Sequence, residues 1–133
     1  ALLERLGIKA RVGILSYARK EDRGRSREVD ENLEAGEQIR EQCIQHGIEA
    51  EHYGILIEKA MREANLIVAP TPPSGNLIFR TLYFLGAGDA IGAPVLNLHR
   101  VFVDTSRNMR YLKAIGLAQT LVELYPLQKI NQE

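Results

Sequence analysis

The sequence predicts an α/β fold with a largely parallel sheet covered by helices on both faces, and three observations carry this prediction. Short apolar segments typical of buried strands alternate with longer segments whose apolar residues recur every three or four positions, as on one face of a helix. Tight hairpin signals are too few for an all-β fold. A chain of 133 residues is long enough to bury a core without disulfides or metals. We therefore expect one α/β domain over residues 1–133.

The expected elements follow in order along the chain. A short first helix ends at Gly7, Ser26 is the expected N-cap of the longest helix, and Ser74 is the expected N-cap of a later one. Prolines at 70, 72 and 73 end the strand before Ser74, because proline cannot donate to a strand ladder. Helices are expected from Ala1 to Leu6, Ser26 to Gly47, Ile55 to Ala64, Ser74 to Gly86 and Asn108 to Leu124, and strands at 11–16, 48–52, 65–69, 93–98 and 101–104.

Composition excludes several classes of function. Lysine and arginine number 17, aspartate and glutamate number 17, and tryptophan is absent, so nothing indicates a nucleic-acid partner. No apolar run reaches the roughly 20 residues of a membrane span, and the start lacks a secretory signal, so we expect a cytoplasmic protein. The single cysteine, Cys43, lies in an apolar helical stripe and is interpreted as a small buried hydrophobe.

Two predicted strand-to-helix turns carry polar groups suited to an anionic ligand. Ser74-Gly75-Asn76 follows the strand NLIVA and its prolines, and Thr105-Ser106-Arg107 follows the strand VFVD. The first N–H groups of a helix are unpaired and its dipole is positive there, while arginine binds phosphate in a bidentate way. We expect both turns at the same edge of one sheet, where α/β proteins bind ligands. The alternative is that the hydroxyls are simple caps and Arg107 a surface charge.

Other polar features are less specific. The basic loop Arg19–Arg27 is expected near strand ends, either as a lid over an anion or as a solvated loop. The histidines at 46, 52 and 99 lack metal-ligand spacing, so we expect surface or loop positions and no metal site. The stretch Gly86–Gly92 has the form of G-x-G-x-x-G but follows a helix instead of a strand, so it is interpreted as a helix end and turn.

Longer stretches resemble a known family. The run ANLIVAPTPPSGNLIFRTLYFLGAGDAIGAPVLNLHRVFVDTSR is similar to the carboxyl-terminal half of the phosphate acetyl/butyryltransferases, with a Gly-Asn helix start, an A-I-G-x-P-like stretch and an aspartate just before Ser-Arg. The stretches RVGILS, REVDENLEAGE, GILIEKA, SGNLIFRTLYFLGAGDAIGAPVL and VFVDTSR resemble the MtxX-type methanogenesis marker proteins, which are described as methyltransferase-related. The resemblance covers nearly the whole chain.

The resemblance implies part of a two-domain enzyme with an architecture like that of isocitrate dehydrogenase, an active site between the domains, and a homodimer. The family reaction moves an acyl group between coenzyme A, as co-substrate, and phosphate. Ser106 and Arg107 match the family's catalytic Ser-Arg pair, and Gly75 and Asn76 match its Gly-Asn turn. The ligand is then a phosphate or acyl phosphate, and this chain, which begins with Ala1, is the carboxyl-terminal half of a longer protein or a processed product.

The chain also departs from the family pattern. An ungapped comparison puts Lys113 where the acetyltransferases carry a catalytic aspartate, and Thr71 where an aspartate usually follows the apolar strand. These departures favour an alternative function, a non-catalytic accessory protein with a methyltransferase partner. A second alternative is a methyltransferase, although no glycine-rich S-adenosylmethionine turn follows the first strand. Whether the chain is an enzyme stays open from the sequence.

Overall fold

The structure is a computed structural model that describes residues 2–105 and 111–125. Contacts divide the chain into two compact units, Ala1–Thr81 and Leu82–Glu133, and each is described by itself. The expectation of one domain over residues 1–133 stays a prediction. Within the described ranges, no helix has both the length and the apolar character needed to cross a membrane.

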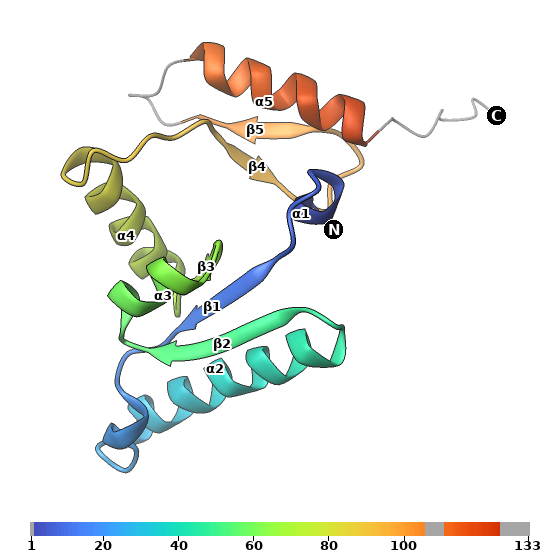
Figure 1. Cartoon of the computed structure of the whole chain (residues 1–133). Coiled ribbons are helices and arrows are strands. Elements are labelled where there is room, and N and C mark those ends of the chain that lie inside the picture. The colour runs from blue at the N-terminus through green and yellow to red at the C-terminus, as the bar shows by residue number, and fades with distance from the viewer. Residues whose placement is uncertain (1, 106–110, 126–133) are drawn as a thin grey trace. The chain divides into compact units, whose positions relative to one another are not determined.

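A three-stranded parallel sheet forms the centre of the first unit (Figure 1). Its strands are β1 (Arg11–Leu15), β2 (Glu49–Gly54) and β3 (Leu66–Val68), in the spatial order β2-β1-β3. Residues 11–14 of β1 pair in register with residues 49–52 of β2, and Leu15 then pairs with Gly54, so that Tyr53 is an extra residue on β2. The prediction of parallel strands is confirmed for this sheet.

Helices cover both faces of the parallel sheet, as the sequence predicts. Side chains alternate between the two faces along a strand. On one face, a Cβ atom added to Gly13 would lie within 3.3 Å of Ala60 on α3 (Ile57–Glu63). On the other face, Ser16 and His52 lie against Gly36 of α2 (Arg27–Gln45). On the α3 side, Leu15, Tyr53 and Ala60 form an apolar cluster, with Ile57, Ile67 and Ile78 packed against them. Ile14 of β1 and Leu33 of α2 are also fully buried, so apolar burial is not confined to the α3 side.

The helix boundaries follow local capping. Ser26 is the N-cap of α2, where the Val29 N–H donates to its Oγ at 3.3 Å, as predicted. The first helix, α1 (Leu2–Arg5), ends at Gly7, which has a φ of 70°. A 3₁₀ turn, η1 (Lys20–Asp22), lies inside the basic loop and was not expected. Helix α4 (Pro72–Phe84) begins two residues before Ser74, which corrects the predicted N-cap.

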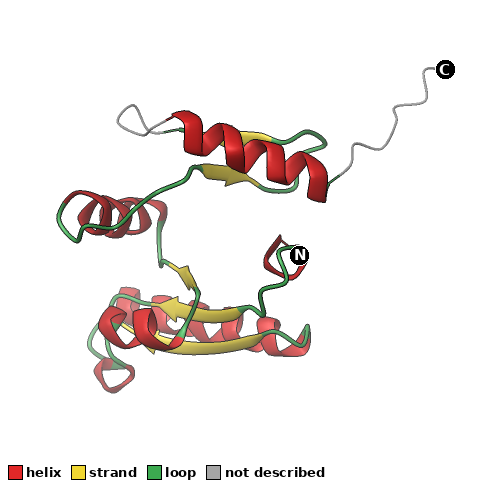
Figure 2. Ribbon diagram, turned by 45° about the horizontal axis from the view of Figure 1, so that its top comes forward, coloured by secondary structure: helices red, strands yellow, loops and turns green. Residues whose placement is uncertain are grey.

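The second unit contains a two-stranded antiparallel ribbon and one helix (Figure 2). Strands β4 (Ala93–Val95) and β5 (Phe102–Asp104) pair with each other, and α5 (Tyr111–Leu124) packs against β5. β4 and β5 form a separate antiparallel pair, so the expectation that both predicted turns lie at the same edge of one sheet is wrong. Residues 108–110, which the sequence assigns to the last helix, lie outside the described residues.

Candidate functional site

The predicted anion site at the start of α4 has an unexpected local structure. Thr71, not Ser74, occupies the capping position. The Thr71 N–H donates to Ser74 Oγ at 3.1 Å, and the Ser74 N–H lies 3.4 Å from Thr71 Oγ1, a reciprocal pattern known as a capping box. The Ser74 hydroxyl also donates to the Thr71 carbonyl oxygen at 2.8 Å. These contacts satisfy polar groups that the sequence argument left open for a ligand.

This helix end presents few backbone donors to an anion. Residues 72 and 73 are prolines and have no N–H, and the Gly75 N–H already donates to the Thr71 carbonyl oxygen at 3.0 Å. Of the predicted residues in this turn, only Asn76 is exposed, while Ser74 and Gly75 are half-buried. An anion at this turn would therefore rely on the Asn76 side chain and the positive end of the helix dipole.

The second predicted turn follows β5 in the other unit. Thr105 is half-buried directly after β5, whereas Ser106 and Arg107 lie outside the described residues. Because β3 and β5 belong to different sheets, the argument that both turns share one sheet edge does not hold. The assignment of an anion to Ser106 and Arg107 stays a prediction.

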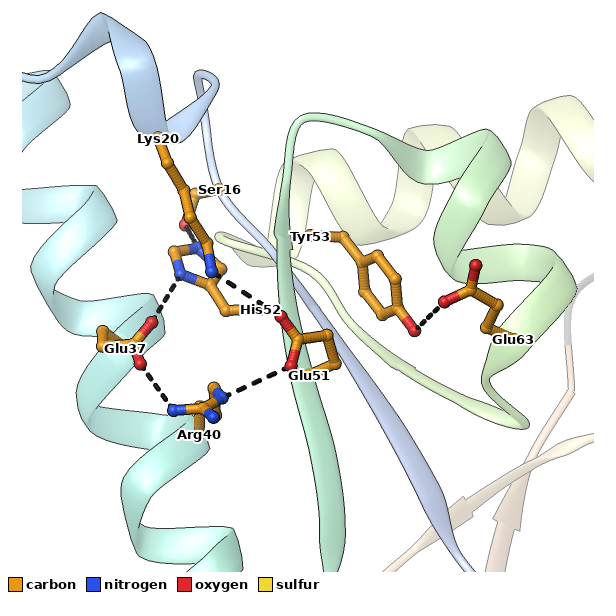
Figure 3. Close-up of polar contacts among 8 residues, drawn as sticks. All are labelled: Ser16, Lys20, Glu37, Arg40, Glu51, His52, Tyr53 and Glu63. Carbon is orange, nitrogen blue, oxygen red and sulfur yellow. Dashed lines mark hydrogen bonds and ion pairs between the residues drawn. The ribbon is translucent and has the colours of Figure 1, made fainter.

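A buried polar cluster on the α2 side of the sheet escaped the sequence analysis (Figure 3). His52, expected at the surface, is only 3% exposed. Its Nε2 lies 2.8 Å from the Ser16 hydroxyl, and its Nδ1 lies 3.3 Å from Glu37 Oε2. Ser16 directly follows β1, His52 lies on β2 and Glu37 on α2, so the cluster joins the helix to the sheet. The other two histidines, His46 and His99, are exposed, as expected.

A hydroxyl, an imidazole and a carboxylate in this order resemble a hydrolase triad, but packing excludes that role for Ser16. Its side chain is 3% exposed and lies beneath α2. A Cβ atom added to Gly36 would lie 2.7 Å from Ser16 Oγ and 2.6 Å from His52 Nε2, so the helix backbone directly covers both atoms. A substrate carbonyl cannot reach a hydroxyl in that position. Ser16 therefore has a structural role in the cluster.

The electrostatics keep the imidazole neutral and the carboxylate ionised. Burial lowers the pKa of His52 below 6.5, although the hydrogen bond to Glu37 opposes this. Burial by itself would raise the pKa of Glu37, but hydrogen bonds from His52 and Arg40 outweigh it and the pKa lies below 4.5. A neutral imidazole then donates a hydrogen bond from Nδ1–H to Glu37 and accepts a hydrogen bond from the Ser16 hydroxyl at Nε2.

Three further charges surround this pair. Arg40 Nη1 donates to Glu37 Oε1 at 2.7 Å, and Arg40 Nε lies 3.5 Å from Glu51 Oε2. Lys20 Nζ, from the basic loop, lies 3.6 Å from Glu51 Oε1. Next to these groups is a cavity of about 210 Å³, whose lining combines loop, helix and strand residues. It is lined by Lys20, Arg23, Leu33, Glu37 and His52.

Lys113, at the position of the family's aspartate, has a partner in the second unit. Its Nζ forms an ion pair with Asp89 Oδ2, between α5 and the segment before β4. A protonated amine held by a carboxylate is the opposite of a general base. Residue 71, the other departure, is the capping residue of α4. Among residues 2–105 and 111–125, no three His, Cys, Asp or Glu side chains gather as for a metal ion, and Cys43 is half-buried instead of buried.

No family model matches the chain. It is 52% identical over 128 residues to a Methanosarcina acetivorans protein named "Putative methyltransferase mtx subunit X", covering 96% of this chain and 46% of that protein. It is 40% identical over 118 residues to a Methanocaldococcus jannaschii protein named "Uncharacterized methyltransferase", and this match covers 85% of this chain and 48% of that protein. The chain thus spans about half the length of the curated relatives it matches.

Among solved structures, the chain is similar to the EutD phosphotransacetylase from Staphylococcus aureus. The TM-score is 0.56 at 22% sequence identity, over 87% of this chain and 40% of that one. The fold therefore defines the chain as an α/β protein with the fold of part of a phosphotransacetylase. Within that class, it is a close homologue of the mtx subunit X proteins over about half of their length, which confirms both parts of the predicted resemblance.

Proposed function

We propose that this chain is part of an accessory subunit of a methyltransferase system, which uses the phosphotransacetylase fold as a scaffold without its acyl-transfer chemistry. The relatives at 52% identity, named as a methyltransferase subunit, support the methyltransferase association. The ion pair between Lys113 and Asp89 is the main observation that supports the proposed loss of acyl-transfer activity. At the position where the family has a base for the thiol of coenzyme A, this chain holds an ammonium group already bound to a carboxylate.

The start of α4 supports the same proposal. An acyl phosphate that gains charge in the transition state needs preorganised donors aimed at it. The Thr71–Ser74 capping box and the prolines at 72 and 73 leave that helix end with its first N–H groups absent or already bonded. The two residues that depart from the family pattern thus both have structural roles. Thr71 caps α4, and Lys113 forms an ion pair with Asp89.

Assembly tests this proposal. The full-length Methanosarcina acetivorans relative is co-expressed with the other mtx subunits of that organism and separated by size-exclusion chromatography with light scattering. We expect one complex of fixed stoichiometry that contains the subunit. A matched variant of the relative, with aspartate at the position aligned with Lys113 of this chain, is expected to assemble equally well. If the subunit elutes as a separate species whichever other mtx subunit is co-expressed with it, the accessory role is contradicted.

A second candidate function is phosphate or acyl-phosphate binding, with coenzyme A as co-substrate and a homodimer as the active form. It is favoured by the sequence position of the Ser-Arg pair, which comes one residue after the end of β5. The ligands in this second unit would be Thr105, Ser106 and Arg107. Phosphate should then raise the melting temperature of the wild-type chain and not that of Arg107→Ala. Equal protection of both, or protection of neither, contradicts this candidate.

A further inference from the structure

The basic loop is fastened to the molecule and is not a freely solvated segment. The Arg19 N–H donates to Asp22 Oδ2 at 3.0 Å, and the Gly24 N–H donates to Asp30 Oδ1 on α2 at 2.7 Å. Just before the loop, Ala18 is 6% exposed, and its carbonyl oxygen would lie 2.6 Å from a Cβ atom at Gly54, a residue with a φ of 61°. The loop backbone is therefore held against the end of β2 and the start of α2.

Two cations of this loop line the cavity described above. Lys20 and Arg23 come from the loop, Leu33 and Glu37 from α2, and His52 from β2. The His52 side chain is 2% exposed, so a buried polar group forms part of the wall, and Leu33, 1% exposed, forms an apolar part. A water molecule occupies about 30 Å³ of liquid, so a cavity of about 210 Å³ holds roughly seven waters or one small molecule.

The charge of this cavity is not balanced by the protein. Glu37 is bound to Arg40 and His52, and Glu51 lies near Arg40 and Lys20. Arg23 forms no ion pair with a carboxylate in the part of the chain that the structure describes. Among the residues that line the cavity, Lys20 and Arg23 are cationic and Glu37 is anionic, so the lining carries one surplus positive charge when His52 is neutral. A single carboxylate matches one surplus positive charge better than a phosphate dianion does.

We propose that this cavity binds a small monoanionic carboxylate. The Arg23 guanidinium and the Lys20 ammonium hold the carboxylate oxygens, because arginine pairs with carboxylates through two parallel N–H donors. Leu33 contacts the aliphatic part of the ligand. Glu37, which also lines the cavity, repels the anion and limits its affinity. The proposal stands on this cavity alone and does not depend on the accessory role.

A titration of the labelled chain followed by two-dimensional NMR tests the proposal, with propionate as the probe and neutral propionamide as its isostere. We expect saturable shifts of the backbone amides of residues 20–23 and 52 with propionate and none with propionamide. Arg23→Ala should bind propionate about tenfold more weakly than the wild type does, because it loses one charge-assisted hydrogen-bonded pair. Arg25→Ala, in the same loop and exposed but outside the cavity lining, is the matched control and should bind as the wild type does.

Two more variants make the outcome unambiguous. Lys20→Gln should also weaken propionate binding, and Glu37→Gln should strengthen it, because it removes the negative charge in the wall. Inorganic phosphate should bind more weakly than propionate. Equal weakening by Arg25→Ala and Arg23→Ala, shifts that map away from the cavity, equal binding of propionamide, or tighter binding of phosphate than of propionate would each overturn the proposal.

Discussion

Thr71 and Ser74 hydrogen-bond each other reciprocally at the start of α4, each accepting from the backbone N–H of the other. This pair converts a helix end that looks open in the sequence into a closed one. The hydroxyl of Ser74, a candidate ligand, is committed to the Thr71 backbone. Thr71, which caps the helix, stands at the position where the family has an aspartate.

The capping pair should show coupled energetics. Thr71→Ala and Ser74→Ala should each lower the free energy of unfolding by about 1 kcal/mol, because each removes a side-chain acceptor of a helix-terminal N–H. Since both act in one motif, the double variant should cost less than the sum of the two. Urea unfolding of the four proteins of this cycle measures the coupling. Strict additivity would show that the two hydroxyls act independently.

Gly36 should be intolerant of even one added carbon. Gly36→Ala places a Cβ atom 2.6 Å from His52 Nε2 and 2.7 Å from Ser16 Oγ, so α2 must shift away from the sheet. We expect a loss of about 1–3 kcal/mol in the free energy of unfolding, the usual cost of overpacking. Gly116→Ala on α5 is the control, because nothing lies within 4 Å of its added Cβ atom, and it should be neutral or stabilising. Similar losses at both positions would contradict the close packing at Gly36.

The buried His52 should make stability depend on pH. Burial lowers its pKa in the folded state, against the hydrogen bond and charge of Glu37 and the charge of Glu51, while the charge of Lys20 adds to the lowering. Between that lowered pKa and about 6.5 the unfolded chain binds a proton that the folded chain does not. The free energy of unfolding should therefore fall as the pH decreases below 6.5, and the contribution is fully present at higher pH.

Urea unfolding between pH 7.5 and 5.5 checks this pH dependence, above the range in which Glu37, with its lowered pKa, titrates. The wild type should lose more stability over this interval than His52→Gln, which lacks the titrating ring. The Ser16 hydroxyl also faces the Asn32 carbonyl oxygen at 3.2 Å, so it has another acceptor when the ring is protonated. Parallel pH profiles for the two proteins would rule out His52 as the source.

Tyr53 should be the tyrosine most resistant to ionisation among those described. Burial and then its hydrogen bond to Glu63 Oε2, at 2.9 Å, raise its pKa to about 12. Tyr53→Phe should cost about 0.5–1.5 kcal/mol in the free energy of unfolding, the net value of one hydrogen bond. Tyr17→Phe, at an exposed ring, should cost nothing measurable. Ultraviolet titration and urea unfolding report both effects, and equal costs for the two variants would contradict a special role of Tyr53.

Strand and helix periodicity predicted most of the elements, because these patterns depend on local burial. The strands at 11–16 and 48–52 were found with small changes in their ends, and Ser26 caps α2 as expected. The register shift near Tyr53 depends on contacts between β1 and β2, which are far apart in the sequence, whereas β4 and β5 pair antiparallel across the short segment 96–101. Those contacts leave no periodic signal in the sequence, so the expectation that both predicted turns lie at one sheet edge was wrong.

The buried cluster was missed for a related reason. A histidine in an alternating strand, such as His52, gives no sign of which face it occupies until the pairing with Ser16 is known. The one available signal was Gly36, a small residue on the apolar stripe of α2, which indicates close approach to the sheet. At the start of α4, two prolines before Ser74 could have placed the cap at Thr71, because proline is favoured in the first turn of a helix.

The exchange of acetyl groups between coenzyme A and phosphate tests the central claim most directly. The full-length Methanosarcina acetivorans relative would be assayed for formation of acetyl phosphate from acetyl coenzyme A, beside the Staphylococcus aureus phosphotransacetylase as reference. A scaffold without acyl-transfer chemistry predicts a rate that equals the protein-free background. A rate within about a hundredfold of the reference enzyme, equivalent to only about 2.7 kcal/mol of lost transition-state stabilisation, would contradict it.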